Sequence, residues 1–407
     1  MAVQFHCGRA RQFLDNRHDR RALHELRTAL RLAPDGAEIH FLLARTHRRL
    51  GNLGVVQPLL RRAVKLGGDG QRAERETWMA LAQSGRLREA EPHLTELLTD
   101  SRDDGMDICE AYVQGYFANL RTREALQLLD AWQRDYPDDA QSYFMRGYLM
   151  QTLTKWPDAA AAYRRGLELA PDETMMRCRL ADVLTELHQI DEASTLFRRC
   201  VDEAPHVPEI LTSWARCLVV QGNVSEARRL LEQALDRSPG DFQALRQLGE
   251  IELSEGEFEE AREHLESAAR QRPYDPTTRN ALGKALRALG RGDEAQLHLD
   301  YVAEAEESLA RMERQLRVVV ERPGDVEVRY DIGMTLLRYG SPEDGARWLL
   351  TVLEQQPDHD AAHEALAAYY ESRGDLRSAA LHRRHGRDSA ERIVSGHSST
   401  ALEKSQE

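Results

Sequence analysis

The sequence predicts an all-α solenoid built from about eleven helix-turn-helix units. Three observations predict it: prolines recur every 34 residues, small residues recur with the same step, and apolar residues within each unit are spaced three and four apart. The proline series is Pro171, Pro205, Pro239 and Pro273, with Pro34 and Pro137 further back. One unit of this length cannot bury its own apolar face, so neighbouring units must stack.

The stretch YFMRGYLMQTLTKWPDAAAAYRRGLELAPD, residues 143–172, shows the layout of one unit. Its small residues predict where two helices cross closely, its larger residues fill the space beside the crossing, and its proline ends the second helix. The alanine recurs along the chain at Ala159, Ala193, Ala227, Ala261 and Ala295. The large residue that follows it recurs as Tyr163, Phe197, Leu231, Leu265 and Leu299.

These units resemble the tetratricopeptide repeat (TPR), which has Leu-Gly and an aromatic residue on helix A and Ala, a large residue and Pro on helix B. One unit matches in order at Leu248, Gly249, Ala261, Leu265, Ala268 and Pro273. Two others match at Leu282, Gly283, Ala295 and Leu299, and at Ile332, Gly333, Leu349 and Pro357. The resemblance implies a right-handed superhelix of TPR repeats in which helix A of each repeat lines the concave face.

The register divides the chain into repeats that begin near residues 3, 37, 71, 106, 140, 174, 208, 242, 276, 326 and 360. Repeats 2 and 3 are degenerate, since Gly68 and Arg102 replace the proline and Val56 replaces the alanine of helix B. From Asp293 to about Val320 helix-forming residues run without Pro or Gly, which predicts a lengthened helix B that acts as a spur or changes the superhelix direction.

We therefore expect four regions: a main array at 1–309, the extension of the long helix and its connection at 310–325, two further TPR-like repeats at 326–386, and a disordered tail at 387–407. Met1 stands only a few residues before the first helix A. This position predicts either a fragment of a longer protein or a first helix that frays.

Composition bounds the class of partner. The chain has 68 acidic against 55 basic residues and a net charge of -13, which argues against nucleic acid. The absence of a membrane-length apolar run, and of an apolar core in MAVQFHCGRARQFL, predicts a cytoplasmic protein without direct membrane insertion. The five cysteines have no paired spacing and are expected to be small buried residues. The excess of arginine over lysine is typical of a GC-rich bacterial genome.

The motifs of known chemistry are incomplete. His24-Glu25 and His363-Glu364 begin the zinc-protease pattern but lack its second histidine, and the loop Asp100–Glu110 carries arginine at a calcium-ligand position. We therefore expect no enzyme activity, no catalytic residue, no metal and no cofactor.

The residues of helix A that packing does not use are the candidates for binding. An apolar set in the fifth repeat contains Phe144, Met145 and Tyr148. A basic and polar set in the sixth to ninth repeats contains Arg179, Arg216, Arg246, Gln247, Asn280, Lys284 and Arg287. An extended peptide with an apolar anchor and acidic residues would suit both sets. The alternative is that the aromatic residues pack on the preceding helix and the arginines pair with Asp182 and Glu250.

The sequence therefore predicts a non-catalytic scaffold that binds protein or peptide segments in its concave groove to assemble a complex. The competing hypothesis is an accessory or regulatory portion of a larger enzyme, or of a secretion or envelope system. Its catalytic or membrane part would lie on a missing N-terminal segment or on a partner chain. A third hypothesis is self-assembly through the end repeats, and the sequence leaves the oligomeric state open.

Overall fold

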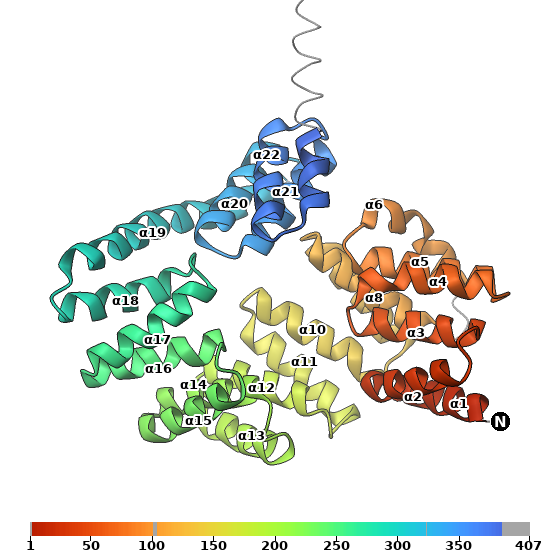
Figure 1. The fold of residues 1–407 in the computed structure, drawn as a ribbon, viewed down its shortest axis with the longest axis horizontal. Coiled ribbons are helices and arrows are strands. Elements are labelled where there is room, and N and C mark those ends of the chain that lie inside the picture. The colour runs from red at the N-terminus through yellow and green to blue at the C-terminus, as the bar shows by residue number, and fades with distance from the viewer. Residues whose placement is uncertain (1, 101–103, 323, 385–407) are drawn as a thin grey trace, which may run out of the picture. The chain divides into compact units, whose positions relative to one another are not determined.

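The structure, a computed structural model, describes residues 2–100, 104–322 and 324–384, and all regular elements there are helices (Figure 1). The helices pack in consecutive pairs, so the predicted all-α repeat fold is confirmed. Arg102 and the tail predicted at 387–407 lie outside the described residues. None of the described helices is long and apolar enough to cross a membrane.

The chain forms two compact units, Met1–Pro171 and Asp172–Glu407. The first unit contains α1 (Ala2–Asp15), α2 (Asp19–Leu32), α3 (Ala37–Arg49), α4 (Val56–Lys65), α5 (Gly70–Gln83), α6 (Leu87–Ala90), α7 (Leu94–Thr99), α8 (Gly105–Ala118), α9 (Thr122–Asp135), α10 (Ala140–Thr152) and α11 (Trp156–Leu169). Short 3₁₀ turns, η1 (Leu53–Val55) and η2 (Glu91–His93), lie before α4 and between α6 and α7.

The second unit contains α12 (Thr174–Glu186), α13 (Ile190–Glu203), α14 (Pro208–Gln221), α15 (Val224–Arg237), α16 (Phe242–Glu255), α17 (Phe258–Gln271), α18 (Pro276–Ala288), α19 (Gly292–Glu321), α20 (Val326–Tyr339), α21 (Pro342–Gln355) and α22 (Asp360–Ser372). A further helical segment follows at 376–384.

The degenerate repeats have irregular second helices. In the third repeat, Pro92 lies where the chain changes from α6 to η2 and then to α7, because proline has no N–H for the helical ladder. In the second repeat, Val56 is fully buried at the place where other repeats carry alanine. The irregular proline and alanine positions seen in the sequence thus coincide with irregular helices.

The two helices of a repeat cross most closely at glycine. A Cβ atom on Gly147 of α10 would lie 2.5 Å from Cε1 of Tyr163 on α11, and one on Gly249 would lie 2.6 Å from Cγ of Leu265. Tyr163 and Ala159 are fully buried at this crossing. The predicted role of the small residues in helix packing is confirmed.

The lengthened helix is α19, a single helix of 30 residues. It packs on α20 from its middle onward: the Oη of Tyr301 lies 2.7 Å from the carbonyl oxygen of Arg338, and Glu304 accepts a hydrogen bond of 3.0 Å from the Oη of Tyr339. In the extension, the Nε2 of Gln315 donates to the Oδ2 of Asp331 at 2.9 Å. These contacts tie the extension to the repeat that follows it.

We predict that Gly147→Ala destabilises the protein, because the added methyl group meets the Tyr163 ring. The expected loss is about 1–3 kcal/mol in the free energy of unfolding, measured by urea unfolding followed by circular dichroism. Gly8→Ala in α1 is the matched control, since nothing lies within 4 Å of its added Cβ. It should stabilise the helix by roughly 0.5–1 kcal/mol, and equal losses in both variants would contradict the close crossing.

Candidate functional site

Helices A of the second unit lie close to one another. α12 contacts α14, α14 contacts α16 and α16 contacts α18, whereas α13, α15 and α17 have fewer contacts with one another. Helices A therefore line the inner side of this unit, and residues at equivalent positions on them form rows across it.

One row alternates in charge: Asp182, Arg216, Glu250 and Lys284 follow one another at steps of 34 residues. The Nη2 of Arg216 lies 2.9 Å from the Oδ1 of Asp182, and Arg216 also pairs with Glu186. Glu250 pairs within its own helix with Arg246, at 2.8 Å between Oε1 and Nη1. Arg216 and Arg246 thus take part in the ion pairs that the alternative interpretation of the sequence expects.

Unpaired positive charge on this face gathers on α18. Lys284 and Arg287 are exposed, one turn apart, and have no ion-pair partner among the described residues. Asn280 lies one turn earlier on the same helix and is half-buried. Arg179 on α12 is 40% exposed at its side chain and lies at the limit of ion pairing, 4.0 Å from Asp182. Of the four predicted cations on α14, α16 and α18, only the two on α18 are unpaired in the described structure.

Gln247 on α16 adds a polar atom without a partner. Its side chain is 8% exposed, and no donor among the described residues lies within hydrogen-bond distance of its Oε1. A buried acceptor left unpaired costs about 1–3 kcal/mol.

Two apolar residues beside the charged row escaped the sequence reasoning. Val219 and Val220, at the end of α14, are 40% and 50% exposed. The equivalent of Val219 on α16 is Leu253, which is half-buried. The sequence feature that could indicate them is a pair of adjacent β-branched residues at solvent-facing positions in the last turn of a helix A.

The apolar set lies in the first unit, on α10, separate from the basic set of the second unit. Met145 is buried, and Phe144 is half-buried with its ring centroid 6.0 Å from that of Tyr163. Tyr148 is 39% exposed, and its ring lies 5.5 Å from that of Phe117. Tyr148 is therefore the exposed member of this set.

The first unit buries a network of ion pairs. Arg48 and Glu76 are 1% and 0% exposed and pair with each other, and the Nη2 of Arg48 lies 3.2 Å from the Oδ2 of Asp107. Burial by itself would raise the pKa of Asp107, but the guanidinium groups of Arg48 and Arg49 lower it below its ordinary value. This network therefore fills space between α3, α5 and α8.

Arg17 extends the network across the first unit. It lies in the turn between α1 and α2, and its guanidinium reaches Glu110 on α8 at 2.5 Å and Asp139, before α10, at 3.4 Å. Segments more than 90 residues apart in sequence are thereby joined. The inner charges of the first unit are used to hold its own helices together.

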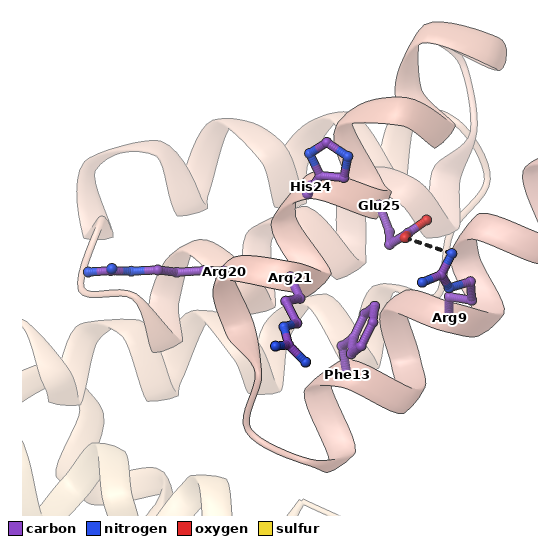
Figure 2. Close-up of a pocket in the computed structure, with 6 residues that line it drawn as sticks. All are labelled: Arg9, Phe13, Arg20, Arg21, His24 and Glu25. Carbon is purple, nitrogen blue, oxygen red and sulfur yellow. Dashed lines mark ion pairs between the residues drawn. The ribbon is translucent and has the colours of Figure 1, made fainter. Parts of the chain in front are cut away.

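A pocket of about 400 Å³ opens between α1 and α2 (Figure 2). Its lining residues are Arg9 and Phe13 from α1 and Arg20, Arg21, His24 and Glu25 from α2. The Nη1 of Arg9 pairs with the Oε1 of Glu25 at 3.2 Å. In the sequence, His24 and Glu25 fit only an incomplete zinc motif, and no motif indicates this pocket.

Metal and thiol chemistry find no built site in the described residues. No group of three or more His, Cys, Asp or Glu side chains there is arranged to hold a metal ion. The five cysteines are buried and free, as predicted. Burial raises the pKa of the Cys109 thiol to about 12, which keeps it protonated at neutral pH.

The paired helices and their stacking define a helical-repeat protein. Two models described as tetratricopeptide repeat match the sequence, one at residues 7–55, 151–208 and 212–276 and the other at 252–315, together just over half of the chain. The chain belongs to the tetratricopeptide repeat family, whose members are generally non-catalytic scaffolds that bind protein partners.

Solved structures to which the chain is similar include MamA, at 20% identity and a TM-score of 0.35, covering 43% of this chain and 96% of MamA. The type IV pilus biogenesis factor PilW has 17% identity, a TM-score of 0.45 and coverage of 48% and 90%. A human IFIT1 dimer with m7Gppp-AAAA has 16% identity, a TM-score of 0.46 and coverage of 87% and 90%. Such low identities and scores say nothing about the partners of this chain. No curated protein matches the sequence significantly.

We predict that Arg48→Met destabilises the first unit by about 3–5 kcal/mol, because Glu76 and Asp107 would remain buried without their shared partner. Urea unfolding followed by circular dichroism measures the change. Arg62→Met is the control, since the Arg62–Asp35 pair is half or more exposed on both sides and is worth at most about 1 kcal/mol. If both variants lose the same small amount, the buried network does not hold the unit together.

Proposed function

We propose that the chain is a non-catalytic scaffold that binds an extended segment of a partner protein along helices A of its second unit. The observation that carries this proposal is the unpaired charge of Lys284 and Arg287 on α18. Arg216 and Arg246, on the preceding helices A, have carboxylate partners within the chain. Of the predicted cations on α14, α16 and α18, only those on α18 are therefore without an ion-pair partner among the described residues.

The ligand has two chemical features. Carboxylates of the segment would bind Lys284 and Arg287, and a charge-assisted hydrogen bond to arginine is about twice as strong as a neutral one. An aliphatic side chain of the segment would cover the exposed Val219 and Val220 on α14. Val219 occupies the position on its helix that Arg287 occupies on α18. Within the same segment, a backbone group would form a hydrogen bond with the amide of the half-buried Asn280.

The remaining predicted residues of the second unit have supporting roles in this proposal. Arg179, Arg216 and Arg246 keep Asp182 and Glu250 neutralised, so that the face does not repel an acidic ligand. Phe144, Met145 and Tyr148 belong to α10 of the first unit and are not part of this site. A flexible segment loses entropy when it is ordered, so we expect micromolar affinity, about -8 kcal/mol. The net charge of -13 supports a protein ligand over nucleic acid.

We predict that the double substitution Lys284→Glu/Arg287→Glu abolishes the binding of acidic peptides. Wild-type and variant chains serve in parallel as bait for a peptide-display library, and enriched peptides are then titrated by fluorescence anisotropy. The wild type should enrich acidic peptides that the variant does not enrich. The variant should bind these peptides at least about tenfold more weakly, a loss of roughly 1.4 kcal/mol in binding free energy.

Arg198→Glu/Arg237→Glu is the matched control. Both arginines are exposed, lie on α13 and α15 in the same unit, and have no ion-pair partner in the described structure. The control should enrich the same peptides as the wild type. Identical enrichment from all three baits would show that the α18 charges are only solvated surface.

A further inference from the structure

The start of the chain departs from its overall charge. The protein has a net charge of -13, yet residues 2–32 carry seven arginines against three acidic residues. Several of these arginines are consumed inside the fold, for example Arg17 by Glu110 and Arg11 by Glu38. What this surface can bind therefore depends on the arginines of α2 that have no ion-pair partner, and not on the total number of arginines.

The outer side of α2 retains a basic strip, formed by Arg20, Arg21, His24, Arg27 and Arg31. All five residues are exposed. Their spacing places them along one side of the helix, over about three turns. None has an ion-pair partner among the described residues, although Arg31 donates to the Oγ1 of Thr28 at 3.2 Å. We call this set the α2 strip.

The two acidic residues of α2 already have basic partners, and the Oδ1 of Asp19 lies 3.6 Å from the Nη1 of Arg49. Glu25 is 7% exposed, accepts from the Nδ1 of His6 at 2.6 Å and pairs with Arg9 at 3.2 Å. The charge of Arg27 also acts on its surroundings: burial and this charge together lower the pKa of His47. The α2 strip therefore has no internal counter-charge and presents its full charge to a ligand.

The pocket between α1 and α2 adds an apolar element next to the α2 strip. Figure 2 shows the Phe13 ring between the side chains of Arg21 and Arg9, while the side chain of Arg20 points away from this ring. The guanidinium of Arg9 lies 5.5 Å from the Phe13 ring centroid and 5.7 Å from that of Phe5, which is 60% exposed. One site thus combines several cations with an aromatic surface of about one side chain in size.

We propose that the α2 strip and the Phe13 pocket bind an acidic segment of a partner protein through its carboxylates and one apolar side chain. This site lies on helix B of the first repeat and is distinct from the proposed ligand face on α18. α2 has 14 residues and is roughly 20 Å long, a length that an extended segment of about six residues spans. A single-stranded RNA would also gain from the strip and could stack a base on the Phe13 ring. The net charge of -13 favours the peptide, because it repels the phosphate backbone of the RNA.

Fluorescence anisotropy on the full chain tests this inference. The probe is a labelled peptide of about eight residues, Glu-rich with one central Phe and long enough to span α2 when extended. Its comparisons are the same peptide with Gln for Glu, the same peptide with Ser for Phe, and a single-stranded RNA of similar length. Every titration is repeated in the Lys284→Glu/Arg287→Glu background, which removes the α18 charges.

The expected result is saturable binding of the acidic peptide in both backgrounds. The triple substitution Arg20→Glu/Arg21→Glu/Arg27→Glu should weaken peptide binding at least about tenfold. This loss is larger than the loss of a single exposed ion pair between protein and peptide would cause. Arg61→Glu/Arg88→Glu/Arg123→Glu is the matched control, because these arginines are exposed, unpaired in the described structure and in the same unit. The control should bind as the wild type does, and circular dichroism should show both variants folded.

Four outcomes would overturn the inference: no saturable binding to the wild type, equal weakening in both triple variants, equal binding of the Gln peptide, or tighter binding of RNA. Equal binding of the Ser peptide would overturn the role of the Phe13 pocket. If the Lys284→Glu/Arg287→Glu substitutions by themselves remove peptide binding, the peptide binds at α18 and not at the α2 strip.

Discussion

The close crossing of the two helices of each repeat is the constraint on which the rest of the structure depends. At Gly147 and Gly249 there is no room for a Cβ atom beside the large residue of the second helix. This crossing fixes which side of helix A is buried, because the side that meets helix B must be small and apolar. The other side of helix A is then free to carry polar residues, and its positions return every 34 residues as rows.

Ion pairing decides which of these polar positions remain available. In the first unit the inner charges, including Arg48 and Glu76, are buried and join distant helices. In the second unit Arg216 and Arg246 are held by carboxylates of the same face. Among the described residues, the unpaired positive charge on the inner face of the second unit lies on α18, and a row of unpaired cations follows the outer side of α2, although the chain as a whole is acidic.

The fold can be predicted from the sequence because the same small and large residues recur at equivalent positions of most repeats. Gly147, Ala159 and Tyr163 have their predicted positions, and the helix-forming run after Asp293 is one helix, α19. The candidate binding surfaces are harder to predict, because periodicity shows which side of helix A is polar but not which charges pair. Asp182 and Arg216 are one repeat apart, so only the stacking of α12 and α14 shows that they meet. The pocket at Phe13 depends on the side-chain positions of two helices and had no motif.

The central claim is that a partner segment binds along helices A at α16 and α18. Hydrogen–deuterium exchange of the full chain, with and without an acidic peptide enriched by the wild type and not by Lys284→Glu/Arg287→Glu, tests it most directly. The account predicts slower exchange in α16 and α18 on binding, with α13, α15 and α17 unchanged. Slower exchange confined to helices B, with no change in α18, would contradict it.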